Sequence, residues 1–424
     1  MNAPMRDGEV LLVTSSFPRW AGDATTPFVH HLAQDLRALG WDVRVLAPHA
    51  PGAACNEILD GVPVHRFRYF WPESLQTVCY DGGALVKLRT NRWNYTRIPF
   101  LVLAQWLAIL SRVIRRKVTL VHSHWLLPQG FTAALSAGLL GIPHVTTVHG
   151  GDVFALQGAI SRICKRLVLR RADAVTVNSS ATLAAVVRLT RSTRELVRIP
   201  MGASANGVGD AAGVRRIRAR FRRGDGPLLV FVGRLVEEKG VGDLLDAVAL
   251  LRSSRPGVSL LVVGDGPHRA SLEQQAARLG IDERVEFCGW LAPDHVRQHL
   301  CAADIFVGPS RPAPDGWVEA QGLTLIEAML AGVPVITTSI GGIADAIRDG
   351  ETGLAVLPGS PRQIAHAINR LTGDPALAGR LSRAARELAL REFTREVSAS
   401  RFSGLYARLC DRGAVAREEK EIRE

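Results

Sequence analysis

The fold is decided by residues 303–342, which read ADIFVGPSRPAPDGWVEAQGLTLIEAMLAGVPVITTSIGG. An apolar strand at 305–307 leads into a loop rich in proline and glycine, and a second apolar strand follows at 333–337. Thr324 and Glu327 have the spacing of a capping box, which predicts a helix between the strands that begins near Thr324 and ends at Gly332. Strand, helix and strand in this order predict a unit of a parallel sheet.

Two glutamates stand eight positions apart in this stretch, Glu319 in the loop and Glu327 on the helix. The start of a helix presents unpaired backbone N–H groups at the positive end of its dipole, which favours phosphate oxygens. Carboxylates on either side of a bound diphosphate would accept hydrogen bonds from neutral sugar hydroxyls. The two residues alone leave another interpretation open, in which Glu327 only caps its helix and Glu319 only solvates its loop.

The length of 424 residues predicts two domains, and 47% hydrophobic with 22% charged residues is typical of a globular protein. Alternating strand and helix patterns break near a segment rich in glycine, alanine and arginine. We therefore expect a first domain at 1–200, a linker at 201–226, a second domain at 227–392 and a terminal helix with a charged tail at 393–424, the helix returning to the first domain.

Cellular location is predicted from three features. No uninterrupted apolar run reaches the ~18–20 residues of a membrane span. The opening residues MNAPMRDGEVLLV lack the apolar region of a signal peptide. The six cysteines are scattered, without a CxxC pair, as is typical of the reducing cytosol. We expect a cytoplasmic protein.

The formal charge of +12 predicts an anionic partner, which is a nucleic acid, a membrane surface or a small molecule. Aromatic residues make up 6% and are not interleaved with the basic clusters, which argues against nucleic acid. An apolar segment at 98–110 is followed by Arg112, Arg115, Arg116 and Lys117. Peripheral contact with an anionic membrane and a merely solvated basic surface around a core helix both stay open.

In the first half of the chain, polar groups follow the predicted strands at the edge where doubly wound sheets bind ligands. Thr26 and Pro27 predict the start of the first helix. His122 and His124 share one face of a strand, but no cysteine or carboxylate lies near them in sequence, so no metal site is predicted. The candidate residues on this side are His149, Ser15, Ser16, Asp23 and Asp152.

In the second half, the predicted strands end in glycine, which lets backbone approach a ligand closely. Arg234 and Lys239 lie five apart at a strand end and a helix start, where they suit phosphate oxygens. Fixed cations and helix N–H groups stabilise a departing diphosphate without a metal ion.

The glutamate pair, the segment AMLAGVPVITT, Gly341-Gly342, Gly233-Arg234 with Lys239-Gly240, and VHGGD at 148–152 together resemble the retaining GT-B glycosyltransferases of the family 4 type. The resemblance implies two Rossmann-like, doubly wound parallel-sheet domains that face a central cleft, with the acceptor on the first and the donor on the second. It implies His149, Glu319, Arg234 and Lys239 as catalytic residues. It also implies a donor site formed by Gly233, Arg234, Lys239, Gly264, Gly266, Trp290, Gly322, Leu323, Thr324 and Glu327.

The resemblance implies transfer of a hexosyl group from a UDP- or GDP-sugar to a hydroxyl acceptor. The basic first domain and the apolar segment at 98–110 are compatible with a lipid-linked saccharide as this acceptor, which suggests the assembly of cell-surface polysaccharide, lipopolysaccharide or exopolysaccharide. The resemblance also implies retention of the anomeric configuration, with the leaving phosphate taking the acceptor's proton. From the residues alone inversion stays open, with Asp23, His30 and Asp152 as candidate bases. A sugar-nucleotide 2-epimerase on the same fold and a non-catalytic sugar-nucleotide-binding module are the alternatives.

Overall fold

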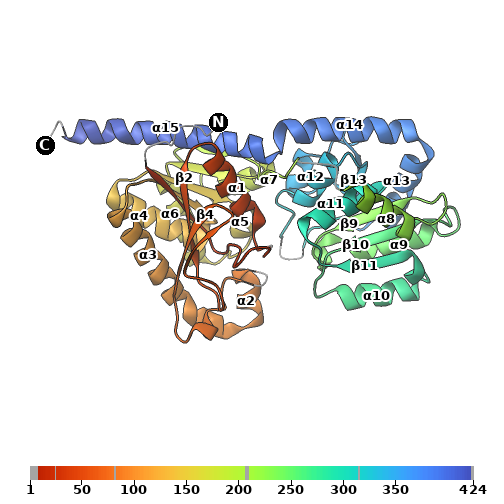
Figure 1. Cartoon of the computed structure of the whole chain (residues 1–424), viewed down its shortest axis with the longest axis horizontal. Coiled ribbons are helices and arrows are strands. Elements are labelled where there is room, and N and C mark those ends of the chain that lie inside the picture. The colour runs from red at the N-terminus through yellow and green to blue at the C-terminus, as the bar shows by residue number, and fades with distance from the viewer. Residues whose placement is uncertain (1–7, 24, 81–82, 206–209, 314–315, 422–424) are drawn as a thin grey trace. The chain divides into compact units, whose positions relative to one another are not determined.

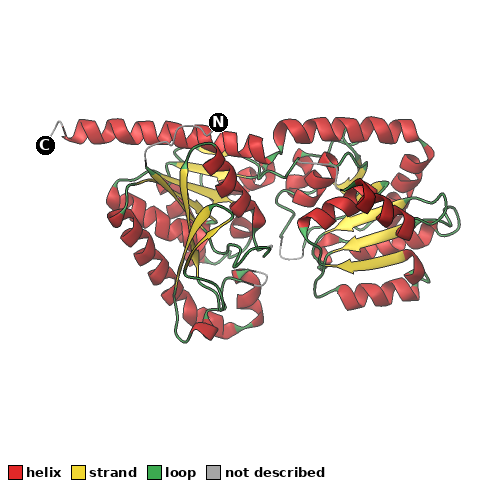
Figure 2. Ribbon diagram, viewed as in Figure 1, coloured by secondary structure: helices red, strands yellow, loops and turns green. Residues whose placement is uncertain are grey.

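The computed structural model describes residues 8–421, except residues 24, 81–82, 206–209 and 314–315. The chain forms two compact units. Unit 1 comprises Met1–Gly202 with Arg395–Glu424, and unit 2 comprises Ala203–Thr394. Each unit is one twisted sheet with helices packed against it, as Figures 1 and 2 show.

Unit 1 is built on an eight-stranded sheet in the order β3-β4-β2-β1-β5-β6-β7-β8. All neighbouring strands are parallel except β3 and β4, which form an antiparallel edge. β1 is followed by β2 on one side and β5 by β6 on the other, so β1 and β5 form the topological switch point. The strands are β1 (Glu9–Val13), β2 (Asp42–Pro48), β3 (Asn56–Leu59), β4 (Val62–Phe67), β5 (Val118–His124), β6 (His144–Val148), β7 (Ala174–Val177) and β8 (Leu196–Arg198).

The helices of unit 1 include the last helix of the chain, which packs on the first. Arg395 forms an ion pair with Asp35, and the Trp41 indole donates a hydrogen bond to Ser403 Oγ. The helices are α1 (Pro27–Ala38), α2 (Ala84–Thr90), α3 (Ile98–Arg115), α4 (Phe131–Leu140), α5 (Gly151–Phe154), α6 (Ala159–Arg171), α7 (Ser180–Leu189) and α15 (Arg395–Glu421).

Unit 2 is built on a six-stranded, entirely parallel sheet in the order β11-β10-β9-β12-β13-β14. Apolar clusters cover both of its faces. The strands are β9 (Leu228–Val232), β10 (Ser259–Val263), β11 (Val285–Gly289), β12 (Ile305–Gly308), β13 (Val335–Thr338) and β14 (Leu354–Val356). The α-helices are α8 (Ala211–Phe221), α9 (Val241–Leu251), α10 (Arg269–Arg278), α11 (Pro293–Ala302), α12 (Leu323–Leu330), α13 (Pro361–Gly373) and α14 (Pro375–Glu392).

The capping box predicted for α12 is wrong. The N-cap is Gly322, whose φ of 78° is in the left-handed region, and no side chain caps the helix. Thr324 is therefore the second residue inside the helix, where its hydroxyl cannot act as the cap. Glu327 is left without a capping role.

Part of the predicted linker is helical. Within residues 201–226, α8 packs Val214, Ile217 and Phe221 against the core of unit 2. Asp210 caps α8, and Arg218 forms an ion pair with Asp304. Because arginines dominate the composition of this segment, the apolar face of α8 was not predicted from the sequence.

By length and composition alone, one helical stretch, Arg92–Arg115, could cross a membrane. In the structure, 17% of its most apolar window is buried. The sequence expectation concerned apolar runs, whereas this helix reaches the length by its mean hydropathy with polar residues included. Isolated polar residues such as Gln105 and Ser111 interrupt the apolar run, but the mean hydropathy of the helix stays high enough for a membrane span.

Candidate functional site

The predicted catalytic cations and Glu319 lie at the carboxyl edge of the sheet of unit 2. β9 is followed by β10 and β12 by β13 on opposite sides, so β9 and β12 form the switch point at which such sheets bind ligands. Arg234 follows β9, and Lys239 ends a short 3₁₀ turn (Glu237–Lys239). Lys239 Nζ contacts Glu319 Oε2, and the two side chains are 16% and 15% exposed. The structure therefore brings Lys239 and Glu319 together.

The charges at this edge differ in how they are paired. The ammonium of Lys239 is balanced by Glu319, whereas the exposed guanidinium of Arg234 has no partner within the described ranges. Two backbone donors are also free at the start of α12, since the N–H groups of Leu323 and Thr324 have no acceptor in the part of the chain that the structure describes. An unpaired cation and a helix N-terminus are both features that bind phosphate oxygens.

Glu327 lies on the second turn of α12 and is partly buried. No hydrogen bond to its carboxylate exists among the described residues. Burial raises the pKa of Glu327 to about 7, and Arg297 opposes this shift. A partly buried carboxylate that lacks a protein donor is suited to accept hydrogen bonds from a ligand's hydroxyl groups.

Nucleotide affinity is expected to rise with pH through about 7. The ionised form of Glu327 accepts hydrogen bonds from hydroxyl groups better than the protonated form, so ligand binding releases a proton. The dissociation constant of a nucleoside diphosphate should fall roughly tenfold between pH 6 and pH 8, measured by isothermal titration calorimetry. The control is Glu327→Gln, because this variant keeps the titration of the phosphates. The same pH dependence in both proteins would contradict the assignment.

At two of the predicted donor-site positions, the fold itself requires glycine. A Cβ on Gly264, whose φ is +131°, would lie 1.9 Å from the carbonyl oxygen of Gly233, and one on Gly266 would lie 2.5 Å from that of Leu235. Neighbouring backbone, rather than a ligand, therefore requires glycine at these positions. Trp290 follows β11 and is 59% exposed, which leaves it accessible for stacking on a base.

In unit 1, His149 follows β6 and is enclosed by aromatic rings. Its Nε2 lies 2.9 Å from Nδ1 of His124, the last residue of β5. The rings of Trp125 and Phe28 have centroids 4.8 and 5.1 Å from that of His149. Burial lowers the pKa of His149 to about 3, so the imidazole is neutral at pH 7. A neutral imidazole can donate or accept one hydrogen bond with its free nitrogen.

Asp152 holds the loop that carries His149. Its carboxylate accepts hydrogen bonds from the backbone N–H groups of His149, Gly150, Val153 and Leu126. Burial raises the pKa of Asp152 to about 6, and these N–H groups limit the rise. With its oxygens engaged in this way, Asp152 is better placed to shape the loop than to act as a base.

Replacing Asp152 with alanine is expected to lower the free energy of local unfolding of β6 and α5 by about 3 kcal/mol, because buried N–H groups would lose their acceptor. Hydrogen exchange of peptides covering residues 144–154 measures this change. Asp411→Ala, at an exposed position of unit 1, is the matched control. Unchanged protection in the Asp152 variant would show that the carboxylate does not hold the loop.

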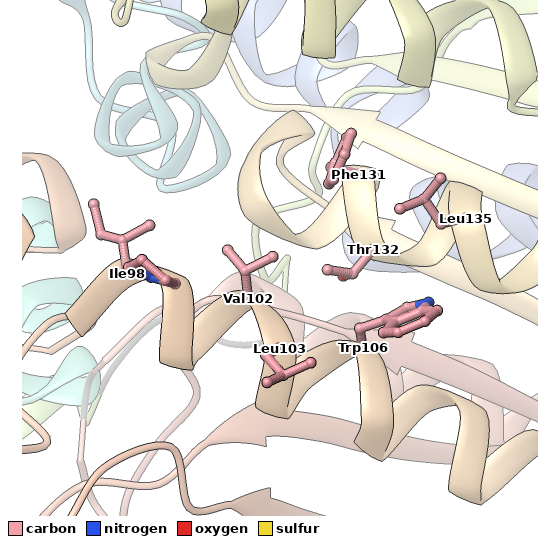
Figure 3. Close-up of a pocket in the computed structure, with 8 residues that line it drawn as sticks. Ile98, Val102, Leu103, Trp106, Phe131, Thr132 and Leu135 are labelled. Atoms are coloured by element: carbon pink, nitrogen blue, oxygen red, sulfur yellow. The ribbon is translucent and has the colours of Figure 1, made fainter. Parts of the chain in front are cut away.

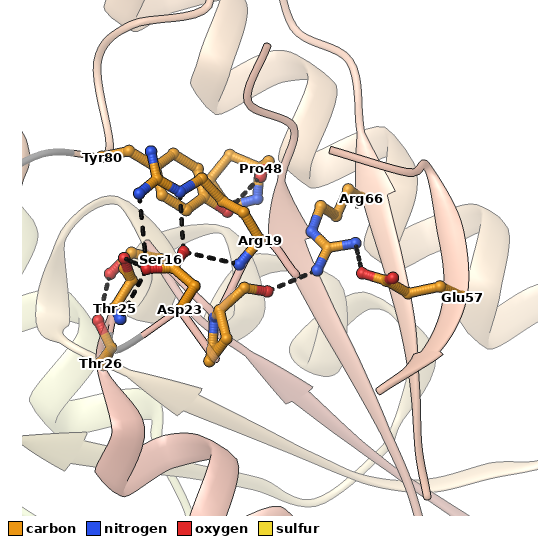
Figure 4. A network of polar contacts seen from close by, with 10 residues as sticks. Ser16, Arg19, Asp23, Thr25, Thr26, Pro48, Glu57, Arg66 and Tyr80 are labelled. Atoms are coloured by element: carbon orange, nitrogen blue, oxygen red, sulfur yellow. Dashed lines mark hydrogen bonds and ion pairs between the residues drawn. The ribbon is translucent and has the colours of Figure 1, made fainter. Parts of the chain in front are cut away.

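The other acceptor-side candidates lie in the loop between β1 and α1, shown in Figure 4. Ser16 Oγ lies 2.6 Å from Thr26 Oγ1, and Ser15 is partly exposed beside it. Asp23 accepts hydrogen bonds from Arg19 and Thr25. Burial raises the pKa of Asp23, but these hydrogen bonds outweigh it, so the pKa lies below its ordinary value. Asp23 therefore stabilises its loop through hydrogen bonds in this structure.

The remaining candidate base is His30 on α1, which is buried. Its Nε2 lies 3.4 Å from the carbonyl oxygen of Leu59 and 3.6 Å from Oδ2 of Asp60. Burial lowers the pKa of His30. Among the described residues, Asp23, His30 and Asp152 contact different partners and not one another.

The aromatic enclosure of His149 by Phe28 and Trp125 was not predicted, and His124 was considered only as half of a metal pair. The segment VHSHW at 121–125 could have indicated that aromatic and imidazole rings gather at this strand end. His122 is occupied by protein groups, since its nitrogens lie 2.5 Å from Tyr406 Oη and 2.6 Å from Thr147 Oγ1. Among the described residues, no group of three or more His, Cys, Asp or Glu could hold a metal ion.

Comparison with known proteins shows the family. A model of the glycosyl transferases group 1 matches residues 215–388, and a model of the glycosyl transferase 4-like domain matches residues 24–202. The GDP-mannose-dependent alpha-(1-6)-phosphatidylinositol monomannoside mannosyltransferase of Mycolicibacterium smegmatis is 30% identical over 78% of this chain and 87% of its own. The chain belongs to the group 1 glycosyltransferases. It is therefore a glycosyltransferase of the family 4 type.

Further similarities extend this result. The 2-deoxystreptamine glucosyltransferase of Streptomyces kanamyceticus is 31% identical over 61% of this chain and 69% of its own. Among solved structures, the sucrose-phosphate synthase of Thermosynechococcus elongatus superposes with a TM-score of 0.74 and 24% identity, covering 95% of this chain and 99% of its own. The fold is GT-B, as the resemblance implied.

Proposed function

We propose that this glycosyltransferase moves a hexosyl group from a UDP- or GDP-sugar to a hydroxyl of a lipid-linked saccharide, with retention of the anomeric configuration. The observation that supports it most is the group of charges at one switch point of unit 2. Among the described residues, Lys239 is paired with Glu319, while Arg234 and the N-terminus of α12 have no partner. A mannosyl- and a glucosyltransferase among the relatives support a nucleotide-sugar donor.

In this proposal, Arg234, Lys239 and the N-terminus of α12 hold the diphosphate, and Glu327 accepts hydrogen bonds from the ribose. Glu319 lies beside the donor sugar, and its contact with Lys239 supports this assignment. The bond between the anomeric carbon and the phosphate oxygen breaks as the acceptor oxygen bonds to the same face of that carbon. The acceptor's proton passes to the departing phosphate, whose charge the fixed cations stabilise without a metal ion.

The test is NMR analysis of the product formed from the donor sugar that the protein accepts. A product whose anomer equals that of the donor supports the proposal, and an inverted linkage overturns the mechanism. Release of nucleoside diphosphate only when an acceptor is present distinguishes transfer from 2-epimerisation. Turnover that Glu319→Ala abolishes distinguishes an enzyme from a binding module.

We also propose that the enzyme works at the cytoplasmic face of the membrane, in the assembly of cell-surface polysaccharide. The support is α3, whose side chains Phe100, Leu103, Leu107 and Ile114 lie on one helix face and are each more than half exposed. Residues 92–117 contain six lysines and arginines and no acidic residue. Such a helix lies on an anionic bilayer with its apolar face inserted.

An apolar groove adjoins this face, between α3 and α4 (Figure 3). Its volume is about 410 Å³, and it is lined by Val102, Leu103 and Trp106 from α3 and by Phe131 and Leu135 from α4. The groove extends the apolar surface of α3, which makes a lipid surface a better match for this side of unit 1 than water.

Binding to the membrane is tested by sedimentation with vesicles of phosphatidylcholine alone and with added phosphatidylglycerol. The wild-type protein should sediment only with the anionic vesicles, and Leu103→Glu with Leu107→Glu should weaken binding at least about tenfold, because two inserted side chains would become charged. Ile58→Glu, at an exposed apolar position on β3, is the matched control. Equal sedimentation of the three proteins would contradict the assignment of α3.

A further inference from the structure

His124 is a fully buried histidine to which the proposed function gives no role. It ends β5, opposite Thr147 of β6 in the register of the sheet. Its Nδ1 lies 2.9 Å from Nε2 of His149, and the two rings are nearly parallel, with an angle of 20° between them. Its other nitrogen, Nε2, is buried and has no hydrogen-bond partner in the part of the chain that the structure describes.

One proton lies between Nδ1 of His124 and Nε2 of His149. Burial lowers the pKa of His124 well below its ordinary value and that of His149 to about 3, so both imidazoles are neutral at pH 7. A neutral imidazole carries one N–H group and one bare nitrogen. Either His124 Nδ1–H donates to His149 Nε2, or His149 Nε2–H donates to His124 Nδ1.

The two arrangements differ in what they leave buried. If His149 donates, His124 carries its own proton on Nε2, and that N–H group is buried without an acceptor. If His124 donates, its Nε2 is only an unused lone pair. Unpaired buried N–H groups are rarer than under-used acceptors, because a lost donor costs the full desolvation of the group. Nor does the adjacent His122 supply an acceptor, since its nitrogens face Tyr406 and Thr147.

We infer that His124 is a positioning residue that donates its Nδ1–H to His149 Nε2 and thereby keeps the proton of His149 on Nδ1. Nδ1 of His149 has no partner among the described residues, so it is the atom left for a ligand. Held in this tautomer, His149 donates a hydrogen bond to the ligand and cannot accept one from it, because its Nε2 already accepts from His124. It therefore selects an oxygen acceptor, such as a sugar hydroxyl or ring oxygen, and disfavours a ligand N–H group at that point.

The assignment of the ligand rests on the proposed function, whereas the tautomer does not. The tautomer is measured on the full-length protein without substrate, by NMR with ¹⁵N-labelled histidine, and His149→Gln identifies the resonances of His149. We expect the ¹⁵N chemical shift of a protonated ring nitrogen for Nδ1 of His149 and that of an unprotonated ring nitrogen for Nε2. A proton on Nε2 would overturn the inference whether or not the protein transfers sugar.

Two variants separate positioning from mere packing. His124→Phe fills the space without a donor, so the proton of His149 should redistribute between its nitrogens. His124→Asn places an amide N–H group near the former Nδ1 and should keep the wild-type tautomer. In a transfer assay, His124→Phe should lower kcat/KM about tenfold, and His124→Asn should restore most of it. An unchanged tautomer in a folded His124→Phe protein would show that His124 only packs against His149.

Discussion

Replacing Lys239 with alanine is expected to lower kcat for glycosyl transfer by about two to three orders of magnitude. In the wild-type protein, the ammonium of Lys239 is balanced by Glu319 and lies at the end of the 3₁₀ turn after β9. Without it, the negative charge on the departing diphosphate loses a fixed cation, and the carboxylate of Glu319 remains partly buried without its partner. The measurement is the rate of nucleoside diphosphate release at saturating donor and acceptor.

The matched control is Lys239→Arg, which keeps the positive charge and should retain a rate within about tenfold of the wild type. The thermal unfolding of both variants shows whether the loss is catalytic. A folded Lys239→Ala protein with wild-type kcat would remove Lys239 from the catalytic group.

The second large effect is expected at Glu327. Its alanine variant should bind nucleoside diphosphate about ten- to a hundredfold more weakly, because the ribose hydroxyls would lose a charged acceptor. Burial already raises the pKa of this carboxyl to about 7, and no protein donor within the described ranges compensates it. The protein should therefore gain, rather than lose, stability when the carboxyl is removed.

Calorimetric titration of the wild-type and variant proteins at pH 8 measures the affinity, where Glu327 is ionised. Glu351→Ala, an exposed glutamate in the same unit, is the control and should bind as the wild type does. Equal affinities for all three proteins would place the ribose elsewhere.

The parts of the fold that follow from local patterns were predictable from the sequence. Pro27 begins α1, and β9 and β10 stand where apolar runs end in glycine. The contact between Lys239 and Glu319 joins residues 80 positions apart, which spacing alone does not show. The expected position of both residues at one sheet edge came from the order of strands and from the resemblance.

The errors share a physical cause, which is that local signals were read without their tertiary context. The capping box was attributed to Thr324 because the left-handed conformation of Gly322 is not visible in sequence. The glycines after β9 and β10 were assigned to ligand binding, and the sequence does not show that adjacent backbone also requires glycine at Gly264 and Gly266. The irregular sequence of residues 48–97 supports no assignment of elements by itself, and the structure places β3, β4 and α2 there.

The central claim is that unit 2 binds the diphosphate of a nucleotide sugar through fixed protein charges. It is tested most directly by the thermal shift of the wild-type protein with UDP, GDP, ADP and TDP, each with EDTA present. A ligand at 100 times its Kd stabilises the native state by about 2.7 kcal/mol. We predict a clear rise in Tm with at least one of these nucleotides, unchanged by EDTA. No rise with any of them would contradict the account.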